Sequence, residues 1–394
     1  MGELRIGTAN SEPAAGTLKV GSNDVQEIYL GANKIWPSSV DPNVDPYVPV
    51  TSSAFKVLGR DYVTASNQSF ALYDEAWNVI TPTDGNGNTI SFGSLNSLNY
   101  SSRINFSSSD NHQYIALLGI NAQSQDYPSI STDYGQTFTK KTTWPKGNGD
   151  IKISKSGRVI LYNSSFNFGT GSYYISNDYG ATVFQPTLPG LTPPYDGGYI
   201  SLCAMSGGGK YILLYKATIN QAIFLSNDYG QTFSDITNLV VGIGGINGFK
   251  GNMGVSLDGS KMQFITYSNN FWYEVFSTDF GQTTFLTGLG ISFTSQNTPY
   301  STIHLNYNGG ISAGNWLGGG AYVLNPPPRY KISLVSGFRL NEGSMSNYGK
   351  YYFTTYGFGN ETFYNDNFLN SQSWSFSTIS KPSPNILAYF VNIQ

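Results

Sequence analysis

The sequence predicts an all-β protein, a β-propeller of about seven four-stranded blades that follows a small N-terminal β-meander. The main observation is a motif, Ser-x-Asp-x-Gly-x-Thr, whose copies begin at Ser131, Ser176, Ser226 and Ser277. These copies lie 45, 50 and 51 residues apart, about the length of one propeller blade. A glycine turn followed by an apolar strand also recurs ahead of the copies, and no stretch shows sustained helical periodicity.

Residues 1–38 are predicted to form a separate β module. The segment Val20–Val25 is echoed by Leu30–Ile35, and each holds a Gly-small-Asn turn between apolar residues. Such turns are typical of hairpins because Gly and Asn tolerate positive φ. Residues 39–50 are rich in proline, which favours extended backbone, so they are interpreted as a semi-rigid linker.

Residues 51–394 are predicted to be the propeller. Degenerate periods occur at Arg60–Ile80 and Ser346–Phe376, residues 300–340 leave room for another, and six or eight blades are the alternative counts. The strand predicted at residues 385–394 would complete the first blade and close the ring, which removes exposed sheet edges. The glycine turns and their apolar strands lie at Ser109–Leu118, Ser156–Tyr162, Ser206–Tyr215 and Leu257–Ile265.

Composition excludes several classes of function. Charged residues make up 11% of the chain and the net charge is −3, without a basic run, so we expect no nucleic-acid partner. Apolar stretches are only strand-sized and the N-terminus lacks a signal core, so we expect no membrane insertion and no export signal. The single cysteine, Cys203, excludes an intrachain disulfide and is interpreted as a small buried hydrophobe.

The repeated motif resembles the Asp box of sialidase-type propellers, also called the BNR repeat. In such a turn the carboxylate accepts hydrogen bonds from its own backbone, the glycine supplies freedom in φ, and Phe138 or Phe233 packs beneath. The resemblance implies a structural, non-catalytic role on the propeller periphery. In two copies an aromatic residue follows one position later, at Phe184 and Phe285, which predicts a bulge or a local shift. The motif residues are Ser131, Asp133, Gly135, Thr137, Ser176, Asp178, Gly180, Thr182, Ser226, Asp228, Gly230, Thr232, Ser277, Asp279, Gly281 and Thr283.

We predict that the protein is not an enzyme and name no catalytic residue. A sialidase, by resemblance, needs an arginine cluster and an Arg-Ile-Pro signature, and the nearest string here is Arg103-Ile-Asn105. The alternative is a glycoside hydrolase on the same scaffold, which needs only two carboxylates across a cleft. The carboxylates considered for it are Asp61, Asp74, Glu75, Glu274, Glu342 and Glu361.

No cofactor and no metal site are predicted. The segment Asp84–Thr89 begins like a calcium loop, but Thr89 stands where the loop requires glycine and Leu95 where it requires glutamate, so a hairpin turn is favoured. The two histidines, His112 and His304, are far apart in sequence and have no Cys or His neighbours.

The segment Leu18–Pro37 resembles short modules near the start of bacteriophage virion proteins. That resemblance implies attachment to other virion proteins through residues 1–38, with a structural alternative in which Trp36 is merely the core of a hairpin. The predicted attachment residues are Val20, Tyr29, Leu30, Ile35 and Trp36.

The sequence therefore predicts a bacteriophage virion structural protein that is assembled in the host cytoplasm. It would be a tail fibre, an adhesin or a decoration of the capsid or tail, and its propeller would bind the host surface or a glycan. A bacterial assembly or surface-binding propeller unrelated to phage is a third alternative. Aromatic residues that would stack on sugars or else fill blade cores are Trp144, Trp272, Trp316 and Trp374.

Overall fold

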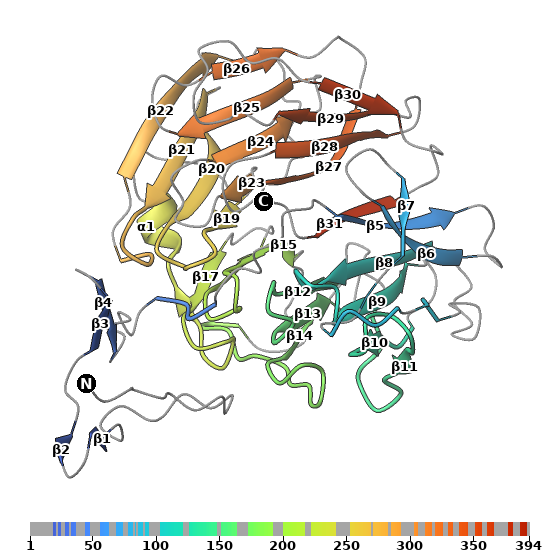
Figure 1. Ribbon diagram of the computed structural model, residues 1–394. Helices are drawn as coiled ribbons and strands as arrows, with labels where there is room; N and C mark the ends of the chain where they lie inside the picture. Colours follow the sequence, from blue (N-terminus) through green and yellow to red (C-terminus); the bar gives the residue numbers. More distant parts are fainter. Residues whose placement is uncertain are drawn as a thin grey trace. The chain divides into compact units, whose positions relative to one another are not determined.

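The chain divides into two compact units, residues 1–44 and residues 45–394. The structure is a computed structural model, and Figure 1 shows its strands as arrows. Strand residues outside the ranges given next are described by their backbone pairing alone. Side chains are described for residues 44–47, 70–73, 78–81, 83, 86–89, 91–93, 105–118, 126–147, 151–163, 172–191, 204–216, 222–239, 253–264 and 275–282.

The described strands of the first unit form two separate hairpins. Strand β1 (Lys19–Val20) pairs with β2 (Asn23–Asp24), and β3 (Ile28–Leu30) pairs with β4 (Asn33–Trp36). Both predicted hairpins are present. The described strands pair within each hairpin, and the predicted meander, which would join all four in one sheet, stays a prediction. Two-residue turns fix pairing within each hairpin, but they do not specify pairing between hairpins.

The described strands of the second unit form antiparallel sheets, numbered here 1 to 7 in the order β31-β5-β6-β7, β8 to β11, β12 to β14, β15 to β18, β19 to β22, β23 to β26 and β27 to β30. A five-residue helix, α1 (Thr237–Val241), follows β18. The strands of sheets 1 to 3 are β31 (Leu387–Val391), β5 (Lys56–Tyr62), β6 (Gln68–Tyr73), β7 (Val79–Ile80), β8 (Arg103–Ser108), β9 (Ile115–Ile120), β10 (Ser129–Ser131), β11 (Thr139–Lys140), β12 (Ile151–Ile153), β13 (Ile160–Asn163) and β14 (Tyr173–Ser176). Those of sheets 4 to 7 are β15 (Ile200–Met205), β16 (Ile212–Lys216), β17 (Ala222–Ser226), β18 (Ser234–Asp235), β19 (Met253–Val255), β20 (Met262–Ser268), β21 (Phe271–Ser277), β22 (Phe285–Ser292), β23 (Ile303–Leu305), β24 (Ser312–Trp316), β25 (Gly320–Asn325), β26 (Tyr330–Ser333), β27 (Arg339–Met345), β28 (Tyr351–Tyr356), β29 (Glu361–Asn365) and β30 (Ser377–Ser380).

Successive sheets contact one another and close a ring, in most cases through their first strands. Contacts join β31 to β8, β8 to β12, β15 to β19, β19 to β23, β23 to β27 and β27 to β31. Sheets 3 and 4 share an apolar core and a backbone hydrogen bond from Ser156 to Gly207. The C-terminal strand β31 lies beside β5 (Figure 1). The two strands are paired, with Leu387 opposite Arg60. The predicted closing strand is therefore confirmed, and the second unit is a β-propeller.

Apolar cores lie between neighbouring sheets. Strand β16 (Ile212–Lys216) is buried at every position, as expected for a strand covered on both faces. Its alternate residues enter different cores, since Leu213 packs towards sheet 5 and Leu214 towards sheet 3. This explains why the strands that follow the glycine turns are continuously apolar rather than alternating.

The predicted bulge in the second and fourth motif copies is wrong. The residue before the motif serine pairs with the residue after the eighth motif position in all four copies: Ile130 with Thr139, Ile175 with Phe184, Leu225 with Ser234 and Phe276 with Phe285. Consecutive strand residues point to opposite faces. Val183 therefore packs in the core between sheets 2 and 3, and Phe184 in the core between sheets 3 and 4. An aromatic residue at either position finds a core without any change of register.

Candidate functional site: the linked turns of sheets 2 to 5

The four motif copies are called Asp turns here: residues 131–138, 176–183, 226–233 and 277–284, of which the last is described as far as residue 282. Their described residues share one turn geometry. In the first, Asp133 Oδ1 accepts hydrogen bonds from Ser131 Oγ at 2.8 Å and from Thr137 N at 2.9 Å, and Thr137 Oγ1 donates to Oδ2 at 2.6 Å. Gly135 N donates to Ser131 Oγ at 2.8 Å. The second and third turns repeat these bonds within 0.1 Å. In the fourth turn Thr283 lies outside the described residues, and the bonds of Ser277 to Asp279 and Gly281 are present.

Each Asp turn places an aromatic residue in the left-handed region. Tyr134, Tyr179, Tyr229 and Phe280 have φ between 58° and 61°, and a glycine with positive φ follows each of them. Two successive residues with positive φ are the mark of a type I′ turn, which suits a twisted hairpin. A residue with a Cβ is disfavoured there by about 1–2 kcal/mol, so the neighbouring contacts hold the aromatic residue in place.

A second set of turns joins the first two strands of sheets 2 to 5. These Ser turns are residues 109–114, 154–159, 206–211 and 256–261. The hydroxyl of the leading serine accepts a hydrogen bond from the backbone N–H five residues later, at 2.9–3.0 Å in all four turns. The fourth position has positive φ and is glycine in three turns and His112 in the other. His112 is 2% exposed and makes an edge contact with Tyr134.

The Asp turn of one sheet packs against the Ser turn of the preceding sheet. The ring of Tyr179 lies 5.0 Å from that of Tyr114, and the guanidinium carbon of Arg158 lies 3.7 Å from the ring centre of Tyr229. The fourth turn repeats the arrangement, since the ring of Phe280 stacks on Tyr211 at 5.5 Å. The sequence analysis did not predict these aromatic contacts between turns of successive sheets. Their signal was visible, because the position before the motif glycine is aromatic in every copy.

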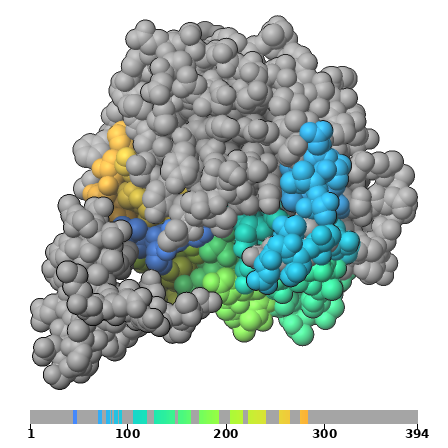
Figure 2. Space-filling view, viewed as in Figure 1, coloured from blue at the N-terminus to red at the C-terminus, as the bar shows by residue number. Residues whose placement is uncertain are grey.

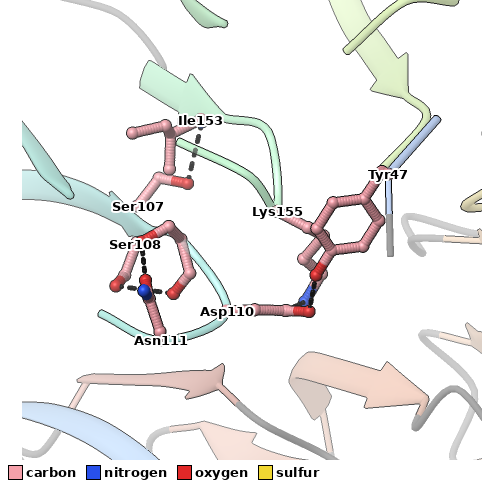
Figure 3. Close-up of polar contacts among 8 residues, drawn as sticks. Tyr47, Ser107, Ser108, Asp110, Asn111, Ile153 and Lys155 are labelled. Carbon is pink, nitrogen blue, oxygen red and sulfur yellow. Dashed lines mark hydrogen bonds and ion pairs between the residues drawn. The ribbon is translucent and has the colours of Figure 1, made fainter. Parts of the chain in front are cut away.

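Backbone hydrogen bonds link the Ser turns into one surface. Asp110 N donates to Lys155 O at 2.8 Å, Ser156 N to Gly207 O at 3.0 Å and Gly207 N to Leu257 O at 2.8 Å. Ser107 Oγ adds a further bond between sheets by accepting from Ile153 N at 3.0 Å (Figure 3). The turns of sheets 2 to 5 thus form a continuous platform.

Part of the predicted linker is docked on this platform. The side chain of Asp45 is 1% exposed. Its Oδ2 accepts hydrogen bonds from Gly208 N at 2.9 Å, from Lys210 N at 3.1 Å and from the hydroxyl of Ser206. Converging backbone N–H groups of this kind form an anion-binding nest. Residues 39–50 are interpreted from the sequence as a semi-rigid linker, and Asp45–Tyr47 within them contact the platform, which proline content alone does not predict.

Tyr47 makes a second anchor two residues later. Its hydroxyl donates to Asp110 Oδ2, while Lys155 Nζ lies 3.2 Å from Asp110 Oδ1. Figure 3 shows the phenol of Tyr47 and the amine of Lys155 meeting at Asp110, with Asn111 turned away from them. Asp45 N also donates to Asp258 O at 2.8 Å. The segment therefore contacts the Ser turns of sheets 2, 4 and 5, and in Figure 2 the blue stretch 44–47 is visible beside green residues.

Local hydrogen bonding controls the titration of the motif carboxylates. Burial alone would raise the pKa of Asp133, but the bonds from Thr137 and Ser131 outweigh it and lower the pKa. The same balance lowers the pKa of Asp178 and of Asp228. Burial raises the pKa of Tyr229, and the Asp45 carboxylate adds to the rise while Arg158 opposes it. These three carboxylates are therefore charged hydrogen-bond acceptors at neutral pH.

Other predicted site residues lie apart from the platform. Trp144 is 5% exposed and stacks parallel to Tyr162 in the core between sheets 2 and 3, so it belongs to the core alternative. The bridge from Thr83 to Thr89 fits the favoured hairpin. The predicted attachment residues Val20, Tyr29, Leu30, Ile35 and Trp36 lie in strands β1, β3 and β4. Several other residues considered in the sequence analysis have side chains outside the described ones: Asp61, Asp74, Glu75, Cys203, Trp272, Glu274, His304, Trp316, Glu342, Glu361 and Trp374.

Among the described residues, no group of three or more His, Cys, Asp or Glu side chains is placed to hold a metal ion. No helix within the described part of the chain is long and apolar enough to cross a bilayer.

Comparison with known proteins identifies the fold. No family model and no curated protein matches the chain. A candidate 6-phosphogluconolactonase from Bacteroides uniformis aligns with a TM-score of 0.52 and 16% identity, over 86% of this chain and all of that one. YCF48 bound to D1 peptide aligns with a TM-score of 0.47 and 15% identity over 75% of this chain and 93% of that one. The GH74 xyloglucanase of Xanthomonas campestris aligns with a TM-score of 0.47 and 11% identity, over 66% of this chain and 43% of that one. The neighbours are β-propellers of varied function, and the predicted number of blades stays a prediction.

Proposed function

We propose that this chain is a bacteriophage virion structural protein, a tail fibre, an adhesin or a decoration of the capsid or tail. Its N-terminal unit attaches to other virion proteins, and its propeller binds the host surface or a glycan. The observation that carries the proposal is the segment Leu18–Pro37, which resembles virion attachment modules and holds two hairpins in a unit separate from the propeller. The virion, assembled in the host cytoplasm, is thus the proposed location.

The arrangement of the first unit supports an attachment role. The proposed attachment residues lie within or at the ends of short paired strands, with Leu30 opposite Asn33 and Tyr29 opposite Lys34. Two-stranded hairpins are marginally stable by themselves in water. A partner that covers these strands would stabilise them, which is the behaviour expected of a docking module.

The linked turns support a binding role for the second unit. Side-chain hydrogen bonds fix the shape of each Asp turn and each Ser turn, and ring contacts join turns of neighbouring sheets, so together the turns form a rigid base for the surrounding loops. Binding residues are commonly placed on loops that a rigid scaffold positions. The low charge of the chain, with 11% charged residues, suits adaptable neutral hydrogen bonding to a glycan or a protein.

Localisation in purified particles tests the proposal. We expect mass spectrometry to find the chain in the virion, and cryo-electron microscopy to find residues 1–38 buried against another virion protein. Replacement of Tyr29 and Trp36 by alanine should abolish incorporation. The control variant Val79→Ala, at a residue 72% exposed on β7, should be incorporated normally.

Absence of the chain from particles would refute the virion role. The same purified protein should then be screened for release of reducing ends from bacterial polysaccharides, since the alternative is a glycoside hydrolase that uses paired carboxylates.

A further inference from the structure

The Ser turn of sheet 4 differs from the other three Ser turns at the positions that face the docked segment. Its second and third residues are Gly207 and Gly208, and the pairs at these positions elsewhere are Asp110-Asn111, Lys155-Ser156 and Leu257-Asp258. A Cβ on Gly207 would lie 2.0 Å from Tyr47 Cδ1, and one on Gly208 would lie 2.3 Å from Asp45 Oδ1. Both glycines have φ outside the left-handed region. They are required for room, and the atoms that need the room belong to the docked segment.

The contacts of the segment are those of a bound peptide. Two anchors lie two residues apart: the Asp45 carboxylate in the nest of Ser206, Gly208 and Lys210, and the Tyr47 phenol on Asp110. Pro46 between them is exposed. Proline fixes φ near −65°, which lowers the conformational entropy that the peptide loses on binding. Alternate side chains give specificity and the backbone bond from Asp45 to Asp258 adds affinity, as in other peptide sites.

The sequence supplies a second copy of half the ligand. Val40-Asp-Pro42 precedes Val44-Asp-Pro46 by four residues, but Asn43 stands where the docked copy has Tyr47. The side chain of asparagine is shorter than that of tyrosine, so it does not reproduce the hydrogen bond that the Tyr47 hydroxyl donates to Asp110. Tyr47 therefore selects which copy occupies the nest.

We propose that the Ser turns of sheets 2, 4 and 5 form a binding site for an Asp-Pro-Tyr peptide, and that the chain's own Asp45–Tyr47 occupies it as a releasable latch. The latch fixes the point at which the chain enters the propeller. This proposal does not depend on the virion role, and it names a ligand of defined chemistry: an aspartate carboxylate, a proline and a phenol, in a local turn in which Asp45 Oδ1 accepts a hydrogen bond from Tyr47 N at 3.0 Å.

Two variants test the latch from the side of the receptor. Gly207→Ala and Gly208→Ala in the full chain keep every polar group but place a methyl group where the segment lies. We expect hydrogen exchange at the Asp45 and Tyr47 amides to accelerate about tenfold or more, with the melting temperature of the propeller changed little. Asn111→Ala, at the third position of the sheet 2 turn, should leave exchange at these two amides unchanged. Unchanged exchange in both glycine variants would overturn the latch, and so would a large fall in the melting temperature, because the segment would then be an integral part of the fold.

A peptide supplied in trans tests the ligand independently. The probe is a fluorescent acetyl-Val-Asp-Pro-Tyr-Val-amide, added to the full chain that carries Asp45→Ala together with Tyr47→Ala. We expect it to bind this variant, to bind the wild-type chain at least about tenfold more weakly because the site is filled, and to lose about tenfold or more when its aspartate is replaced by asparagine. Failure to bind the opened variant, or equal binding of the two peptides, would overturn the proposal.

Discussion

Removal of one Asp-turn carboxylate should weaken the propeller by about 2 kcal/mol. In the third Asp turn, Asp228 accepts hydrogen bonds from Ser226 Oγ at 2.8 Å, from Thr232 N at 2.9 Å and from Thr232 Oγ1 at 2.5 Å. A typical hydrogen bond contributes about 1 kcal/mol net, and bonds to charged groups contribute more. Thr232 is exposed, so water replaces part of what it loses. Asp228→Ala therefore costs about 2 kcal/mol, and Asp228→Asn, which keeps one oxygen acceptor, about 1 kcal/mol.

Equilibrium unfolding in denaturant measures this difference. The full chain and its variants should be compared by tryptophan fluorescence and by circular dichroism, so that a change in midpoint is separated from a change in slope. Gln231→Ala is the matched control, because this exposed side chain lies in the same turn, and it should stay within about 0.5 kcal/mol of wild type. If Asp228→Ala matches this control, the carboxylate does not hold the turn and the reasoning is refuted.

Three further predictions follow from the same geometry. The folded-state pKa values of Asp133, Asp178 and Asp228 are lowered, so their contribution to the free energy of unfolding is complete above the ordinary carboxyl pKa of about 4 and is lost as the pH falls through the lowered values. Between pH 7 and pH 2 the free energy of unfolding should therefore fall less steeply for Asp228→Asn than for the wild type. Equal slopes would contradict this prediction. Gly230→Ala should cost about 2 kcal/mol in denaturant unfolding, because φ is 82° and the new Cβ would lie 2.7 Å from Ile175 Cδ1. Trp144→Ala should cost about 3 kcal/mol or more, since the ring is buried; a loss of glycan binding at unchanged stability would instead favour sugar stacking.

Local turn chemistry explains what the sequence predicted correctly. Glycine with positive φ, a serine hydroxyl and an aspartate carboxylate act within a few residues of one another, so the spacing in Ser131–Phe138 is enough to predict a hairpin turn. A motif period close to the length of a blade then predicts the propeller, and strand β31 was predicted because an open ring leaves exposed edges.

The unchanged register of the Asp turns could not be read from the motif. A one-residue displacement of the aromatic residue suggested a bulge, but sheets 2, 3 and 4 offer a core on either side of each strand. Val183 packs in one core and Phe184 in the other, and the backbone hydrogen bonds between Ile175 and Phe184 are kept. The availability of a second core is a property of the ring, since it depends on a neighbouring sheet some 50 residues away.

The sequence by itself determined the all-β class, the order of turns and strands, and the bonds that each turn makes with its own residues, because these depend on contacts between near neighbours. Only the tertiary structure decided that Asp45 meets Gly208, that Tyr47 meets Asp110, and that Tyr229 lies against Arg158. These partners are separated by tens to more than a hundred residues, and nothing in either member of a pair encodes the other. They meet because the ring of sheets brings successive turns to one surface, where a buried carboxylate must be hydrogen-bonded. There Gly208 leaves room for the Asp45 carboxylate and Gly207 leaves room for the Tyr47 ring.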